Sequence, residues 1–305
     1  MDKTLPTVTW HAGERALQDL VGSGEVFAGL EPRIFHTALT DHQRAFFAEL
    51  RFLLAGTVDA EGRPWATLVA GRKGFVHAIE PTRLTVGAHP APDDPAASGW
   101  TPDASVAFLG IDFATRRRFR VNGSIAATGP YGADITPRQV FGNCPKYIQP
   151  RMIADEVEPG VAAPAFLRAS LDPRALEIIA AADTFFVASF VDRDDGERQV
   201  DVSHRGGPPG FVTVQDDGWL VVSDYPGNRF FNTMGNMLVN PRAGVLFIDF
   251  ATGDLLQITG RTEILVGEAG EDGEPEMHEP DRAWRLLPEA IVFRARASPL
   301  RWTSL

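Results

Sequence analysis

Three polar segments of the sequence combine residue types that can hold an anionic ligand. Residues 201–207 place Ser203, His204 and Arg205 at the expected end of a strand, before two glycines that let a ligand approach the backbone. Strand alternation puts Ser203 and Arg205 on one face and His204 on the other. Taken alone, His204 is better explained as an ordinary strand-end histidine than as a catalytic group.

The second polar segment, residues 223–241, predicts a strand end at Ser223, a tight turn and then a helix. Asn228 and Arg229 would lie at the helix start, where free backbone N–H groups and the positive end of the helix dipole favour a phosphate. Arg229 could add a bidentate contact to that phosphate. The alternative is that Asn228 only caps the helix and Arg229 is solvated. The apolar residues expected to point inward from this helix are Phe230, Phe231, Met234, Met237 and Leu238.

The third segment, residues 136–151, predicts a two-turn helix that is capped by Thr136, opened by Pro137 and ended by Gly142. The polar and aromatic residues that follow include Asn143, Lys146 and Tyr147. Cys144, the only cysteine, invites a nucleophile hypothesis, but the sequence pairs it with no histidine or aspartate. A buried structural thiol is therefore the preferred interpretation.

The composition limits the partners of the protein. A net charge of -11 and a pI near 5.1 over 305 residues disfavour binding to nucleic acid or to anionic membranes. The seven histidines show no metal-ligand spacing and the single cysteine excludes a cysteine-based zinc cluster, so we expect no metal site. The first residues lack the apolar stretch of a secretory signal, and we expect a cytoplasmic protein.

An internal repeat indicates which elements position these segments. Residues 111–115, Ile-Asp-Phe-Ala-Thr, recur at 248–252, and Gly-Phe-Val at 74–76 recurs at 210–212. The shifts are 137 and 136 residues. A helix-start signal precedes each copy, at Thr40 in the first and at Asp172 in the second. Each half predicts a helix, three strands, a loop and two further strands, which is typical of an antiparallel meander that closes into a small barrel.

The repeat defines the expected domains. We place an N-terminal extension at 1–39, the first half at 40–150, a linker at 151–169 and the second half at 170–305. One loop differs between the halves, because residues 91–100 have no helical pattern and no basic residue. The phosphate-binding helix start is therefore expected in the second half alone, with one ligand site per chain. The run Arg116 to Arg118 is expected to be a turn, and the acidic run Glu268 to Glu279 a solvated loop.

In segments 201–207, 224–229 and 141–148 the chain resembles the pyridoxamine 5'-phosphate oxidase-related FMN-binding family, in its internally duplicated branch. The resemblance implies a mainly β fold with flanking helices, in which two tandem split barrels form a pseudo-dimer that holds FMN between them. It also implies that FMN phosphate lies near Ser203, Arg205, Ser223, Asn228 and Arg229. The flavin ring would lie against the backbone of Val202 and Val222, with Asn143, Lys146 and Tyr147 reaching in from the other half. His204 and Asn232 complete the expected cofactor-binding set.

The resemblance further implies an FMN-dependent oxidoreductase that passes hydride or electrons from a reduced nicotinamide or another donor to a small acceptor. Flavin chemistry resides in the cofactor, so no catalytic side chain is assigned. The chain ends with Pro299-Leu300-Arg301-Trp302 and lacks the family's phosphate-recognition ending, so oxidation of pyridoxamine phosphate itself is not expected. The alternatives are a non-catalytic protein that binds flavin, haem or deazaflavin, and a duplicated barrel without a ligand. Related barrels usually pair, which suggests a homodimer.

Overall fold

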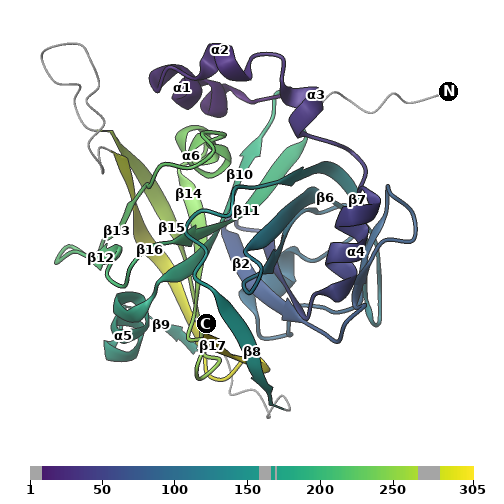
Figure 1. Cartoon of the computed structure of the whole chain (residues 1–305). Coiled ribbons are helices and arrows are strands. Elements are labelled where there is room, and N and C mark those ends of the chain that lie inside the picture. Colours follow the sequence, from purple (N-terminus) through teal and green to yellow (C-terminus); the bar gives the residue numbers. More distant parts are fainter. Residues whose placement is uncertain (1–8, 158–165, 169, 267–281) are drawn as a thin grey trace, which may run out of the picture.

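The computed structural model describes residues 9–157, 166–168, 170–266 and 282–305 of the chain, which form two large β-sheets side by side (Figure 1). The sheet of the first half has seven strands in the order β2-β1-β5-β6-β7-β4-β3. These strands are β1 (Phe52–Val58), β2 (Pro64–Ala70), β3 (Val76–His77), β4 (Leu84–Val86), β5 (Ser105–Asp112), β6 (Arg117–Gly129) and β7 (Gly132–Gly142).

The sheet of the second half follows the order β11-β10-β14-β15-β16-β13-β12, and a short additional strand, β9 (Phe166–Arg168), pairs with β16. Its strands are β10 (Thr184–Asp192), β11 (Arg198–Gly206), β12 (Val212–Val214), β13 (Leu220–Ser223), β14 (Arg242–Ile248), β15 (Leu255–Val266) and β16 (Arg282–Arg294). Adding nine to each strand number of the first sheet gives the order of the second. The two halves therefore have the same topology.

Apolar packing holds the two halves together. Each barrel has its own core, and a third apolar cluster between them contains Leu54 from the first half and Phe186 and Val202 from the second. The backbones approach closely at Gly56, where a Cβ atom would lie 3.3 Å from the Cβ atom of Ala188. The predicted fold is confirmed: it is mainly β, and its two tandem split barrels pair as a pseudo-dimer.

The helices lie at the edges of the two barrels. They are α1 (Ala12–Leu20), α2 (Gly24–Phe27), α3 (Glu31–Ile34), α4 (Asp41–Glu49), α5 (Pro173–Ala181) and α6 (Asn232–Val239), with one 3-10 helix, η1 (Pro95–Gly99). Thr40 and Gln43 form the predicted capping box at α4, and Asp172 accepts a hydrogen bond from the backbone N–H of Ala175 at α5. Among the described helices, none is long and apolar enough to cross a membrane.

The structure corrects the two-turn helix predicted from Thr136 to Gly142, because this segment is part of strand β7. The cap signals at Thr136 and Pro137 act only locally, whereas pairing with β6 provides backbone hydrogen bonds for almost the whole segment. Pro137 is tolerated because it lies at a bulge opposite Gly123, where the ladder of hydrogen bonds is interrupted. The strand order that the two halves share has seven strands, two more than the five that the sequence predicts for each half.

The stretch expected as a linker, residues 151–169, contributes strands of its own. Its first residues form β8 (Arg151–Glu156), which pairs with the C-terminal strand β17 (Leu300–Ser304), and β9 lies near its end. The C-terminal residues are thus tied to the segment that joins the halves. The acidic run from Glu268 to Glu279 lies outside the described residues.

Candidate functional site

A polar pocket lies between the two halves, at the ends of β11 and β13 and the start of α6. Its free volume is about 100 Å³. Ten of the twelve predicted cofactor-binding residues line it: Asn143, Lys146, Tyr147, Ser203, His204, Arg205, Ser223, Asn228, Arg229 and Asn232. Val202 and Val222 do not, because their side chains are buried in the apolar clusters behind the pocket. Ser203, His204 and Arg205 all reach the pocket, although they alternate along β11.

The start of α6 differs from the prediction in position. The helix begins at Asn232, so Asn228 and Arg229 precede it in a loop. Asn228 accepts a hydrogen bond from the backbone N–H of Phe230 (3.2 Å) and does not cap the helix. Phe231 takes the cap position in a left-handed conformation (φ 58°), with no side-chain hydrogen bond. The first N–H groups of α6 therefore lack a side-chain cap at the pocket.

One prediction about the inward face of α6, that Leu238 belongs to it, is wrong. Leu238 is 48% exposed, because it lies in the last turn of the helix, where Val239 is equally exposed. Met234 and Met237 do pack in the core of the second barrel, as predicted. The inward face of α6 thus holds the helix in place, and its first turn remains available to the pocket.

Positive charge dominates the pocket, although the chain as a whole is acidic. Only one acidic residue is among the residues that line it, Asp224. The six cationic residues are Arg118, Arg120, Lys146, Arg205, Arg229 and Arg282. Sequence reasoning missed Arg118, Arg120 and Arg282. Arg118 was assigned to a turn, but it lies on β6 and alternates with Arg120, a period-2 pattern that could have been recognised.

Arg118 determines the hydrogen-bonding state of His204. Its Nη1 atom lies 3.0 Å from His204 Nδ1, and its Nη2 atom donates to the carbonyl oxygen of Cys144 (2.6 Å). Because a guanidinium only donates, His204 Nδ1 must accept and Nε2 must carry the hydrogen. Burial, followed by the charges of Arg118 and Arg205, lowers the pKa of His204 well below its ordinary value. His204 is therefore a neutral donor. The Cys144 thiol, predicted to be buried, is partly exposed.

The floor of the pocket is a network around Arg120. This side chain donates to Asp201 (2.9 Å), to the hydroxyl oxygen of Ser203 (2.6 Å) and to the amide oxygen of Asn232 (3.2 Å). The Thr233 hydroxyl donates to Ser203 (2.7 Å). Burial is the main cause that lowers the pKa of Arg120, and it lowers the pKa of Arg118 to about 9. With this pKa the Arg118 guanidinium remains charged at neutral pH, and Arg120 is paired with the buried carboxylate of Asp201.

Several buried N–H groups of the pocket have no acceptor among the described residues. They are Nε of Arg118, Arg120 and Arg205, Nη1 of Arg282, and Nε2 of His204. A buried donor without a partner is costly, roughly 1–3 kcal/mol for a neutral group and more for a charged one. The concentration of such donors at one uncapped helix start indicates a site for an anion.

Two tyrosines that line the pocket pack against each other. The rings of Tyr147 and Tyr225 come from opposite halves and their centroids are 5.3 Å apart. The Tyr147 hydroxyl donates to the carbonyl oxygen of Pro226 (3.0 Å). Tyr147 also has a positive φ of 66°, which is uncommon for a residue with a side chain. The free volume of about 100 Å³ is below the roughly 300–1,000 Å³ usual for small-molecule sites, so a larger ligand requires side chains that line the pocket to move.

The equivalent place in the first half is filled by the protein itself. At the repeat shifts of 136 and 137, Thr67 corresponds to Ser203 and Gln257 to Arg120. Both donate to the carboxylate of Asp94, and Arg294 adds a further hydrogen bond (2.8 Å). Asp94 also caps η1, a 3-10 helix that the sequence did not predict, by accepting from the N–H of Ala96. An internal carboxylate thus occupies the place that is open in the second half.

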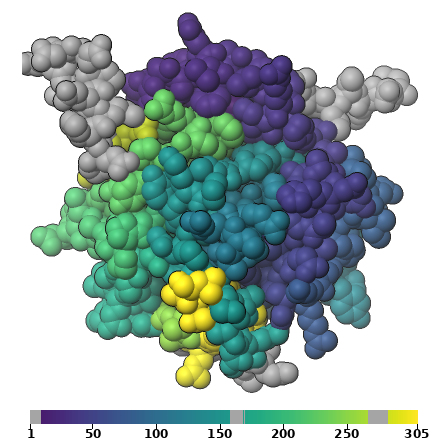
Figure 2. Space-filling view, viewed as in Figure 1, coloured from purple at the N-terminus to yellow at the C-terminus, as the bar shows by residue number. Residues whose placement is uncertain are grey.

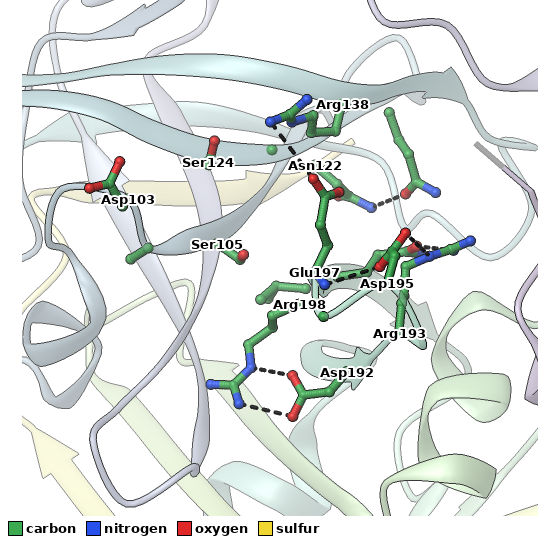
Figure 3. A pocket seen from close by; sticks show the side chains of 16 residues that line it. Asp103, Ser105, Asn122, Ser124, Arg138, Asp192, Arg193, Asp195, Glu197 and Arg198 are labelled. Carbon is green, nitrogen blue, oxygen red and sulfur yellow. Dashed lines mark hydrogen bonds and ion pairs between the residues drawn. The ribbon is translucent and has the colours of Figure 1, made fainter. Parts of the chain in front are cut away.

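A larger groove, of about 740 Å³, lies between the turn that joins β10 to β11 and strands β5, β6 and β7 of the first sheet (Figure 3). Its charged side chains pair with one another, as Arg198 does with Asp192 (2.7 Å) and Arg138 with Glu197 (3.9 Å). No aromatic residue is among the described residues that line it. The groove therefore offers neither an unpaired cation cluster nor a surface for a flat ring.

Comparisons with known proteins support the predicted family for part of the chain. No curated protein matches the chain. Solved structures that resemble it include the haem storage protein HutZ of Vibrio cholerae (17% identity, 39% of this chain and 91% of that chain, TM-score 0.26). A FAD-binding protein of Mesorhizobium loti is also 17% identical (43% and 96%, TM-score 0.28). Because these TM-scores are below 0.5, we conclude nothing further from them. Residues 171–294, which span β10 to β16, match the pyridoxamine 5'-phosphate oxidase family, the family predicted from the resemblance.

Proposed function

We propose that the chain binds FMN in the pocket at the start of α6 and acts as an FMN-dependent oxidoreductase of the pyridoxamine phosphate oxidase-like class. The observation that carries this proposal is the set of buried N–H donors without acceptors around an uncapped helix start. A phosphate provides several acceptor oxygens and a double negative charge, which suits this arrangement. Reduced nicotinamide or another small donor, a small acceptor and a homodimer remain part of the proposal.

Individual residues would hold the phosphate in different ways. Arg229 is exposed at the rim and has no ion pair among the described residues, so it is available to a ligand. Arg205 already pairs with Asp224 (2.9 Å) and would keep this carboxylate away from the anion. Ser203 is committed to Arg120 and Thr233 and would position them, in place of the direct phosphate contact expected from the sequence.

The flavin, when bound, supplies the hydride or electron chemistry, and the chain binds and tunes it. The rings of Tyr147 and Tyr225, which line the pocket, would offer aromatic surface to a flat ring. The charge of Arg118 and the Nε2–H of His204 would favour electron density on a bound ring. These residues would thus stabilise a reduced, anionic ligand.

The tautomer of His204 favours flavin over haem among the candidate ligands. A histidine binds haem iron through an unprotonated ring nitrogen. Here Arg118 uses the lone pair of Nδ1, and the buried Nε2 carries the hydrogen, which has no acceptor among the described residues. Iron binding by Nε2 would require the hydrogen to move to Nδ1, where it would oppose an Arg118 N–H. The site is therefore better suited to an acceptor atom of an organic ligand.

Titration of the purified chain with FMN and riboflavin tests the proposal. One charge-assisted phosphate contact contributes about 1.5–3 kcal/mol, so FMN should bind at least roughly tenfold more tightly than riboflavin. Equal Kd values would refute the phosphate site. Haemin should not displace FMN. Oxidation of reduced nicotinamide by the FMN-loaded chain separates the enzyme from the carrier: tight FMN binding without turnover of any donor would favour the non-catalytic alternative.

A further inference from the structure

The N-terminal helix α1 lies directly on α6, the helix whose start forms the proposed phosphate site (Figure 2). The contact depends on two glycines. A Cβ atom on Gly13 would lie 2.1 Å from the carbonyl oxygen of Gly235, and a Cβ atom on Gly235 would lie 2.7 Å from the backbone nitrogen of Glu14. Any larger residue at either position would separate the helices. The segment His11 to Glu14 thus packs closely on α6.

This close approach places the carboxylate of Glu14 on the first residue of α6. Glu14 is 1% exposed. One carboxylate oxygen accepts from the side-chain amide of Asn232 (2.6 Å), and the other accepts from the backbone N–H of His11 (3.0 Å). The second bond belongs to the capping box that starts α1. Glu14 therefore joins the start of α1 to the start of α6.

Asn232 connects Glu14 to Arg120, which lines the pocket. Its amide nitrogen donates to Glu14 while its amide oxygen accepts from Arg120 (3.2 Å), so the orientation of the amide is fixed from both sides. Helix α1 makes a second link, because the Gln18 amide donates to the carbonyl oxygen of Phe230 (3.4 Å). The two links bracket Phe231, the left-handed residue that sets the direction of the uncapped helix start.

The charge of Glu14 bears on an anion in the same pocket. Burial raises the pKa of this carboxyl to about 8, so it is mostly neutral at pH 7. The charged and titratable groups around it are His11 and Arg15 at the start of α1, Arg193 in the turn after β10, Asp201 on β11 and Arg120 on β6. Above pH 8 the ionised carboxylate would add a buried negative charge one side chain away from Arg120 and would oppose an anionic ligand.

We propose that Glu14 is a positioning residue of the anion pocket, which acts through the amide of Asn232 on Arg120 and on the start of α6. The N-terminal helix is then part of the ligand-binding structure, although none of its residues lines the pocket. This inference rests on the proposed function, because it concerns the same site and takes FMN as the ligand.

A double-mutant cycle tests the inference, with Kd for FMN measured by calorimetry in Glu14→Gln, Asn232→Ala and the double variant. A glutamine cannot accept from both His11 and Asn232 without turning the Asn232 amide away from Arg120. We expect Glu14→Gln to raise the Kd roughly tenfold in the natural chain and less than about twofold in the Asn232→Ala background. Equal effects in both backgrounds would overturn the inference. Glu25→Gln, an exposed change on α2, is the matched control and should leave the Kd unchanged.

The pH dependence of binding gives a second measurement that a purely structural role would not affect. The Kd of the natural chain for FMN should rise between pH 7 and about 8, before Arg118, with a pKa of about 9, loses much of its charge, and Glu14→Gln should remove most of that rise. The same rise in both proteins would overturn the inference. If Glu14→Gln does not fold, Gln18→Ala replaces it as the test variant. An unchanged Kd for FMN in Gln18→Ala would count against the inference. A natural chain that binds no FMN would refute the proposed function instead.

Discussion

Replacement of Arg229 by glycine should make the protein more stable and a poorer ligand binder at the same time. Arg229 has a φ of 57°, in the left-handed region that costs a residue with a Cβ atom roughly 1–2 kcal/mol. Glycine removes this cost, and the exposed guanidinium has no ion pair among the described residues to lose. Part of the gain is offset by the greater freedom of glycine in the unfolded chain, so we expect a net stabilisation of about 0.5–1 kcal/mol.

The effect on the ligand should be larger and opposite. Loss of one charge-assisted phosphate contact, about 1.5–3 kcal/mol, would raise the Kd for FMN by roughly tenfold to a hundredfold. The measurements are thermal unfolding of the ligand-free protein and calorimetric titration with FMN. Stabilisation without loss of affinity would show that Arg229 does not contact the phosphate. Loss of both stability and affinity would show that the fold needs the Arg229 side chain.

The chain offers a matched control for this experiment. Arg116 also has a left-handed backbone (φ 54°) and an exposed side chain, but it lies in the turn before β6 and does not line the pocket. Arg116→Gly should give the same gain in stability with an unchanged Kd for FMN. Equal loss of affinity in Arg116→Gly and Arg229→Gly would refute the placement of the phosphate.

Three further outcomes follow from the structure. Asp94→Asn should lower the free energy of unfolding by about 3–5 kcal/mol in a denaturant titration, because Arg294 loses a buried carboxylate, while FMN stoichiometry stays at one per chain. The free energy of unfolding should fall by up to about 2 kcal/mol between about pH 6.5 and 8, because the folded chain keeps a proton on Glu14 that the unfolded chain has released. The lowered pKa of His11 affects stability only below about pH 6.5. Unfolding curves across this pH range should show no such fall in Glu14→Gln. Tyr147→Ala should speed FMN association in stopped-flow measurements, because it removes a large ring that lines a small pocket, and an unchanged rate would show that this residue does not limit entry.

The fold was predictable because its signals are repeated and local. The recurrence of Ile-Asp-Phe-Ala-Thr at Ile111 and Ile248 predicts that both halves share a topology, and their strand orders agree. The caps at Thr40 and Asp172 depend on residues within one turn, so the sequence places them correctly. Pro137 shows the limit of this reasoning, since its segment has good helix signals but pairs with β6.

The candidate site was predictable only in part, because its charges come from both halves. Residues next to the expected helix start were identified together, and they do meet around one pocket. Arg118 and Arg120 belong to a strand of the other half, and only their pairing with His204 and Ser203 shows that they face the same pocket. Asp94 was missed for the same reason, since its role depends on contacts with residues up to 200 positions away.

The pairing of two barrels within one chain affects how ligand binding depends on dilution. In a site shared by two separate chains, the two walls come apart when the protein is diluted below its dimer dissociation constant. Here Arg118 from one barrel and Arg205 from the other are joined covalently and by the apolar cluster between the halves. The effective concentration of each wall relative to the other is therefore high and does not depend on the protein concentration. The affinity of the pocket should be the same at nanomolar as at millimolar protein.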